Sequence, residues 1–151
     1  MQSLSQDIQK SAKMIFRVFF GSEVREKNEI SDNYSGIGVD LLMDCDGRKK
    51  LSLFLEENTV KSIMKQLTGE DDINKGTIAR DIVSELAYLI AVNAIDENYE
   101  DYKLYNPAPS QGIKNSDINS RKFSSDIGEF AIAIEWNCVF IYPQKLIKTI
   151  W

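Results

Sequence analysis

The chain contains no histidine, and only two of its 151 residues are cysteines and three are prolines. The absence of histidine excludes Ser-His-Asp and Cys-His catalytic arrangements and every metal site that uses an imidazole. Cys45 and Cys138 lie far apart in strand-like sequence, so we expect neither a zinc site nor a disulfide framework, and two buried reduced thiols are the simplest interpretation. Any chemistry must therefore use carboxylates, amides, hydroxyls and lysines.

Long apolar runs are also absent. The longest candidate, from Ile82 to Ile95, is interrupted by Ser84, Glu85 and Asn93, whereas a membrane span needs about 20 apolar residues. The first residues carry acids and amides instead of a basic stretch followed by an apolar block, so no signal peptide is expected. We therefore expect a cytoplasmic protein with no membrane partner.

Positive charge is scarce, because the net charge is −5 and the pI is near 4.8. Nucleic-acid affinity comes mostly from neutralising phosphates with Lys and Arg, so the composition argues against a nucleic-acid partner. The short basic clusters Arg48–Lys50 and Arg121–Lys122 are expected at a turn or a solvated strand edge. An acidic surface instead suits a partner with a basic patch.

The first half of the chain has the pattern of a helix, a hairpin and a second helix. Apolar residues at helical spacing predict a helix from Leu4 to Phe20. Alternating residues from Ser35 to Phe54, interrupted by the Asp46-Gly47 dipeptide typical of a type I′ turn, predict a hairpin. Helical spacing from Val60 to Leu67 then predicts a short helix.

The second half follows the same order. A long helix is expected from about Thr77 to Asn98, then a strand from Tyr102 to Tyr105 and a loop with one short strand from Asn106 to Asp126. Strict alternation from Gly128 to Trp136 predicts the clearest strand, and Cys138 to Tyr142 continues or pairs with it. Pro143 suits the first turn of a closing helix that carries Leu146, Ile147, Ile150 and Trp151.

Hairpins separated by helices favour the α+β class, with a mainly antiparallel sheet packed with helices. The element order indicates a duplicated helix-strand-strand-helix unit, although no repeat exists at the level of residues. At 43% hydrophobic residues, residues 1–151 are expected to form a single domain with a sufficient core.

The long helix carries two distinct stripes. One predicts the face on the sheet: Ile78, Ile82, Leu86, Leu89 or Ile90, and Asn93, where the amide is expected to be at least half-buried with a backbone partner. The other should be exposed: Asp81, Glu85, Tyr88, Val92, Ile95, Asp96 and Tyr99. A helix that is partly apolar on its exposed side usually has a partner.

Two interpretations of the exposed stripe are open. Asp81 and Glu85 can be ordinary solvent-facing residues, while Tyr88 and Val92 pack under the loop from Asn106 to Asp126. Alternatively, the stripe docks a partner and presents a carboxylate to that partner's active site. Spacing alone does not distinguish these interpretations.

At these residues the chain resembles the CheX branch of the CheC, CheX and FliY family of chemotaxis phosphatases. The resemblance is carried by Asp81-x-x-x-Glu85, by Asn106-Pro107-Ala108-Pro109, and by the helix residues Ala87, Leu89, Ile90, Ala91, Asn93 and Ala94. Phe19-Phe20-Gly21 and Ile127-Gly128-Glu129-Phe130 also look like family segments. The resemblance implies a CheC-like fold and removal of the phosphoryl group from the response regulator CheY.

The resemblance further implies roles for single residues. Glu85 would pair with a lysine of a phosphorylated CheY-like receiver domain, with Asp81 and Val92 on the partner-binding surface. The regulator would supply the magnesium ion, so the protein would need no cofactor of its own. Where the family places a water-orienting asparagine this chain has Tyr88, whose single hydroxyl stands farther from the backbone. We therefore expect weak or absent phosphatase activity.

The family resemblance also implies a homodimer that pairs through sheet edges. An alternative function is a non-catalytic CheC-like scaffold or dimerisation module in chemotaxis or two-component signalling, based on the apolar stripe and on Ile147, Ile150 and Trp151. A stand-alone hydrolase finds little support, because the sequence has no Gly-rich phosphate loop, no carboxylate cluster for metals and no histidine.

Overall fold

The computed structural model describes residues 3–27, 35–74, 77–96, 99–110, 120–136 and 146–150. The helices are α1 (Leu4–Phe20), α2 (Glu57–Thr68) and α3 (Ile78–Ile95). The strands are β1 (Val24–Lys27), β2 (Gly36–Asp44), β3 (Arg48–Glu56), β4 (Tyr102–Tyr105), β5 (Ala108–Pro109), β6 (Ser120–Ser125), β7 (Gly128–Trp136) and β8 (Leu146–Ile150).

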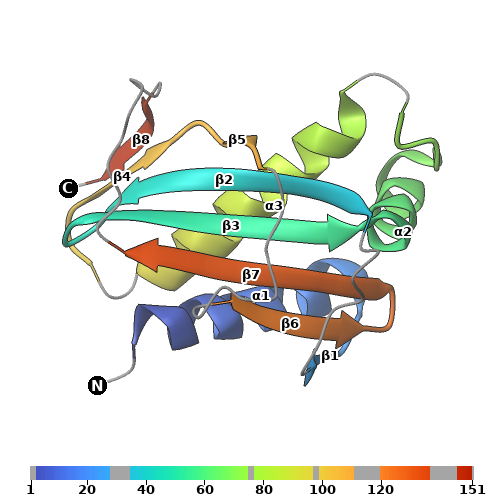
Figure 1. Cartoon of the computed structure of the whole chain (residues 1–151), viewed down its shortest axis with the longest axis horizontal. Helices are drawn as coiled ribbons and strands as arrows, with labels where there is room; N and C mark the ends of the chain where they lie inside the picture. Colours follow the sequence, from blue (N-terminus) through green and yellow to red (C-terminus); the bar gives the residue numbers. More distant parts are fainter. Residues whose placement is uncertain are drawn as a thin grey trace.

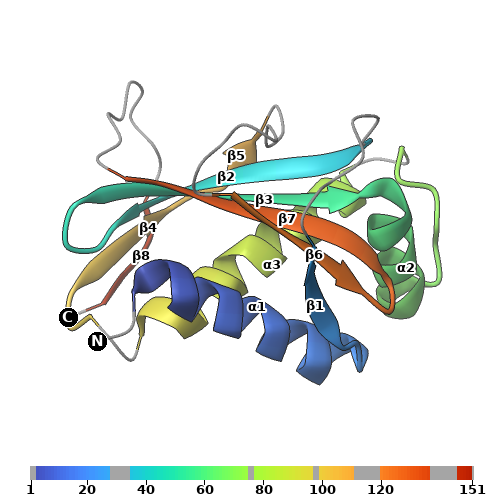
Figure 2. The same ribbon diagram turned by 60° about the horizontal axis from the view of Figure 1, so that its bottom comes forward.

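Within these residues the strands form one antiparallel sheet in the order β1-β6-β7-β3-β2-β4-β8, and β5 pairs with β2 beside β4. Helices α1 and α3 lie side by side on one face of the sheet, and α2 packs at one end (Figures 1 and 2). The predicted α+β class with a mainly antiparallel sheet is confirmed. No helix in the described ranges has the length and apolar character needed to cross a membrane.

The central hairpin forms as predicted, with Asp44 opposite Arg48 and positive φ angles at Asp46 (+53°) and Gly47 (+105°). The basic cluster Arg48–Lys50 lies at this turn, which was one of the two expected positions, but Lys49 is buried and not solvated. Its ammonium donates to the carbonyls of Cys45 and Asp46 and lies 5.4 Å from the ring centre of Trp136. Burial of the Lys49 ammonium is tolerated because the ammonium donates hydrogen bonds to two carbonyl groups of the turn.

The expected buried thiol is confirmed for Cys45, and burial raises the pKa of this thiol. Cys138 lies outside the described residues.

The core lies between the sheet and the two long helices. One face of the three central strands is almost fully buried: Val39, Leu41, Met43, Leu51, Leu53, Leu55, Phe130, Ile132 and Ile134. From α1, Ile8, Ala12 and Phe16 pack against this face, and the Phe16 ring stacks on Phe130 at 4.4 Å between centroids. The alternating apolar residues of these strands therefore form the face of the sheet against which α3 packs.

The face that α3 turns to the core agrees with the predicted one at Leu86 and Ile90 and differs from it elsewhere. Its buried residues are Ala79, Val83, Leu86, Ala87, Ile90, Ala91, Ala94 and Ile95. Ile78 is exposed and Ile82 is half-buried, because the small alanines allow a close approach to α1 and the sheet. Ile95 is fully buried and therefore does not belong to the exposed stripe.

The expectation of a buried Asn93 with a backbone partner is also wrong. Asn93 is exposed, and its Nδ2 donates to Ser11 Oγ at 3.0 Å. The Ser11 hydroxyl in turn donates to the Ile90 carbonyl at 2.7 Å. The amide therefore links the two long helices through a serine side chain.

The predicted closing helix is wrong for residues 146–150, which form β8. This strand pairs antiparallel with β4, with Tyr102 opposite Ile150. An edge strand leaves backbone groups unpaired, and an added strand satisfies them in a way that a helix cannot. The second half therefore departs from the predicted helix-strand-strand-helix order. The predictions for Cys138 to Tyr142, for Pro143 and for Trp151 lie outside the described residues.

Two further strands differ from the sequence expectation. Strand β1 was not expected, and it pairs with β6. The segment expected to hold one short strand contributes both β5 and β6, while residues 111–119 lie outside the described part of the chain.

The C-terminal end of α3 is tied to β4. The helix ends at Ile95 with Asp96 as its C-cap, earlier than the Asn98 that the pattern indicated. The buried Tyr102 hydroxyl donates to Asp96 Oδ1 at 3.1 Å. Burial, together with this hydrogen bond, raises the pKa of Tyr102 to about 12.

Gly128 should be irreplaceable at the β6–β7 turn. Its φ is +134°, and an added Cβ would lie 2.1 Å from Thr59 Oγ1 of α2. We expect Gly128→Ala to lower the free energy of unfolding by about 3 kcal/mol, through backbone strain and overpacking. Gly69→Ala is the matched control, because Gly69 also has a positive φ (+80°) but open space around it, and should cost only about 1 kcal/mol. Equal losses in denaturant titrations would contradict the close contact.

The Tyr102–Asp96 pair predicts a pH dependence. The pKa of Tyr102 rises from 10.0 to about 12 on folding, so the folded state holds this proton more tightly. Stability should therefore fall as pH rises from 10 to 12, by up to about 1.4 kcal/mol per pH unit. Tyr102→Phe should remove this part of the slope in urea titrations, whereas Tyr105→Phe should keep it. An unchanged slope in Tyr102→Phe would contradict the raised pKa of Tyr102.

Candidate functional site

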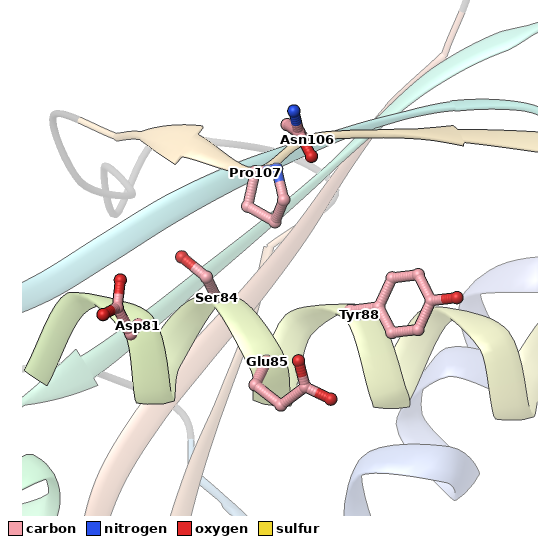
Figure 3. A pocket seen from close by; sticks show the side chains of 6 residues that line it. All are labelled: Asp81, Ser84, Glu85, Tyr88, Asn106 and Pro107. Atoms are coloured by element: carbon pink, nitrogen blue, oxygen red, sulfur yellow. The ribbon is translucent and has the colours of Figure 1, made fainter. Parts of the chain in front are cut away.

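A hollow of about 410 Å³ lies between α3 and the segment that follows β4 (Figure 3). The helix wall consists of Asp81, Ser84, Glu85 and Tyr88, and the opposite wall consists of Asn106 and Pro107. The four helix residues are spaced three and four apart, which places them on one face of α3. Two predicted segments of the chain, the exposed stripe and the Asn-Pro segment, therefore meet here.

The opposite wall is held by strand β2. Leu104 of β4 pairs with Met43, and Ala108 of β5 pairs with Asp40, so the residues between them are fixed at both ends on one strand. The Ser110 amide extends the attachment by donating to the Gly38 carbonyl at 2.9 Å. The position of the Asn106-Pro107 wall is thus set by sheet hydrogen bonds, with the φ angle of Pro107 fixed by its ring.

Asp81 and Glu85 form an acidic rim on the helix wall. Both are exposed, and within the described residues neither has an ion-pair partner. Thr77 Oγ1 donates to Asp81 Oδ2 at 3.1 Å, in the first turn of α3, where the helix dipole favours a carboxylate. Glu85 lies one turn farther along the helix. Because its carboxylate is exposed and has no ion-pair partner within the described residues, it is available to a cation on another molecule.

Tyr88 closes one end of the hollow. It is half-buried, and its ring packs against the core. Figure 3 shows the hydroxyl pointing toward the C-terminal end of α3, away from Ser84 and Glu85. On that side lies Tyr102, whose pKa is raised mainly by burial and Asp96, with a smaller contribution from Tyr88. The phenol therefore borders the hollow without directing its oxygen toward the acidic rim.

The predicted site residues separate into two groups. The structure brings Asp81, Glu85 and Tyr88 together around the hollow, whereas Val92 is half-buried against the core and does not line it. Elements of both interpretations are present, because Tyr88 is half-buried beside Pro107 while the two carboxylates stay exposed.

Two pocket residues were not chosen as site residues from the sequence. Ser84 follows Asp81 by three positions on the same helix face, a spacing that was available as a signal. Asn106 belongs to the Asn-Pro segment that resembles the family, although nothing local placed it opposite α3. Both add polar groups to the hollow.

The described residues contain no group of three or more His, Cys, Asp or Glu side chains that could hold a metal ion. The hollow thus offers two carboxylates, a hydroxyl, a carboxamide and a phenol. This set can form hydrogen bonds and ion pairs with a charged surface.

No protein-family model matches the chain, and no curated protein matches its sequence. Solved structures do match. The chemotaxis protein CheX of Vibrio vulnificus has a TM-score of 0.69 at 17% identity, over 89% of this chain and 97% of that one. A chemotactic CheC-like protein of Shewanella oneidensis gives 0.65 at 16% identity, over 86% and 96%.

A third match is a CheX–CheY–BeF3–Mg²⁺ complex of Borrelia burgdorferi, with a TM-score of 0.61 at 15% identity, over 88% of this chain and 98% of that one. At such identities the likeness concerns the fold, and it extends over nearly the whole length of each matched chain. The resemblance drawn from the long helix is thus confirmed for the fold, and the chain has the fold of the CheX and CheC-like chemotaxis proteins.

Proposed function

We propose that this protein belongs to the CheX-like chemotaxis proteins and binds a phosphorylated CheY-like receiver domain at the hollow beside α3. The observation that carries the proposal is the pair of exposed carboxylates, Asp81 and Glu85, beside a polar hollow on a fixed helix. A structure with the same fold is a CheX–CheY–BeF3–Mg²⁺ complex, which supports a receiver as the partner.

In this proposal Glu85 forms an ion pair with a lysine of the receiver, and Asp81 adds negative charge one turn away. The net charge of −5 favours encounter with a basic face. The phosphoryl group and the magnesium ion both come from the receiver, so the protein contributes hydrogen-bonding groups and no cofactor. The site is built on a helix and on sheet-anchored backbone, which reduces the ordering cost of binding.

A homodimer is part of the same proposal. Within the described residues β1 and β8 are the outer strands of the sheet. Strand β1 carries Arg25, Glu26 and Lys27, and charged side chains oppose pairing between edges. We therefore assign the dimer contact to the β8 edge.

Binding to the receiver can be tested by calorimetric titration with each CheY-like receiver of the source organism, with and without beryllofluoride and Mg²⁺. We expect tighter binding to the beryllofluoride-activated form. Glu85→Gln should weaken this binding by about tenfold to a hundredfold, the loss of one charged hydrogen bond.

Glu26→Gln is the matched control, since it makes the same change of charge at the opposite edge of the sheet, where Glu26 pairs with Arg121. It should leave the affinity unchanged. Equal affinity for both receiver forms would favour the non-catalytic scaffold, and no binding to any receiver would overturn the proposal.

Sedimentation velocity tests the dimer separately. The expected species has about twice the chain mass of 17.2 kDa. A monomer at concentrations of about 100 µM, well above the range of stable dimers, would contradict the dimer and leave receiver binding untouched.

A further inference from the structure

The resemblance assigns no role to two polar groups of the hollow, the hydroxyl of Ser84 and the carboxamide of Asn106. Asn106 is exposed, and within the described part of the chain no hydrogen bond of its side chain is found. Figure 3 shows it on the wall opposite α3, farther from the helix than Pro107, and between Ser84 and Tyr88 along the helix direction. An amide held in this place is available to a molecule that enters the hollow.

The position of Asn106 is unusually well determined for an exposed residue. Its neighbours on both sides pair with β2, two positions before it through Leu104 and two positions after it through Ala108. Pro107 removes further backbone freedom. Little backbone entropy remains to be lost when this residue engages a ligand, which favours effective positioning.

A carboxamide combines an acceptor and a donor on one planar group. In phosphoryl transfer the protein does little covalent chemistry and acts mainly by placing the nucleophile, and a side-chain amide is a known means of orienting an attacking water. Among the six residues that line the hollow, only Asn106 offers an amide. The hydroxyl of Tyr88 points away from the acidic rim.

We propose that Asn106 orients the water that hydrolyses the aspartyl phosphate of the bound receiver, a step that rests on the proposed function. The amide Oδ1 accepts a hydrogen bond from the water, and Nδ2 donates to a phosphoryl oxygen. The water oxygen forms a bond to phosphorus as the bond between phosphorus and the aspartyl oxygen breaks. That electron pair remains on the aspartate carboxylate, and the water's proton leaves with inorganic phosphate.

With Asn106 in this role, the expected activity changes. Weak or absent acceleration was expected because the helix presents Tyr88 where the resemblance calls for an asparagine. The opposite wall supplies a carboxamide from a different element, and Glu85 remains on the helix for contact with the receiver. Hydrolysis would then be shared between the two walls, with Asn106 in contact with the reacting water.

The test measures phosphate release from a receiver that has been phosphorylated with a small phosphodonor, alongside affinity for its beryllofluoride form. Asn106→Ala and the nearly isosteric Asn106→Asp should each lower the acceleration at least tenfold, because the first removes the amide and the second removes its donor. Asn106→Ala should lower the affinity for the beryllofluoride receiver by a smaller factor than it lowers the acceleration, because the complex loses only the hydrogen bond from Nδ2 while hydrolysis also loses the oriented water. Asn58→Ala, at an exposed asparagine on α2, should leave both quantities unchanged.

The outcomes separate the two proposals. Full activity in Asn106→Ala, with activity lost in Tyr88→Phe, would overturn the inference and assign the step to the phenol. Wild-type protein that binds the beryllofluoride receiver without accelerating hydrolysis would overturn the inference while receiver binding stands. Failure of the wild type to bind would overturn both.

Discussion

Strand β2 carries both walls of the candidate site. Helix α3 packs against β2, whose buried residues include Val39, Leu41 and Met43. Strands β4 and β5 pair with the edge of β2 and hold Asn106 and Pro107 between them. The separation of the two walls is therefore set by the register of β2 and not by a free loop. A shift of one residue in that register would exchange the buried and exposed faces, which the core forbids.

Helix α3 must both bury apolar residues and pack closely against α1 and the sheet. These two requirements explain why hydrophobic periodicity misplaced part of its core-facing side. Hydrophobic periodicity favours the large residues Ile78 and Ile82 for the core. Close packing against α1 and the sheet instead selects Ala79, Val83 and Ala87, because small side chains allow the backbones to approach. The exposed positions Asp81 and Glu85 were identified correctly, since charge is a clearer signal of exposure than size is of packing.

The elements that were predicted well are those specified by local sequence. Helix α1, the hairpin, α2 and β7 each carry their own periodicity and their own turn or cap, such as the positive φ at Gly21 and Gly69. Strands β1 and β8 were missed because their structure depends on partners distant in the chain. The same limit applies to Asn106, whose place opposite the helix follows from its pairing with β2.

The central claim is that a phosphorylated receiver docks where the acidic rim of α3 faces the Asn106-Pro107 wall. The most direct measurement is a crystal structure of the complex with a beryllofluoride-activated receiver. Our account predicts a receiver lysine within hydrogen-bonding distance of Glu85, and the Asn106 carboxamide directed at the beryllofluoride group or at a water beside it. A receiver bound on another surface, or the Tyr88 hydroxyl facing the beryllofluoride group in place of Asn106, would contradict the account.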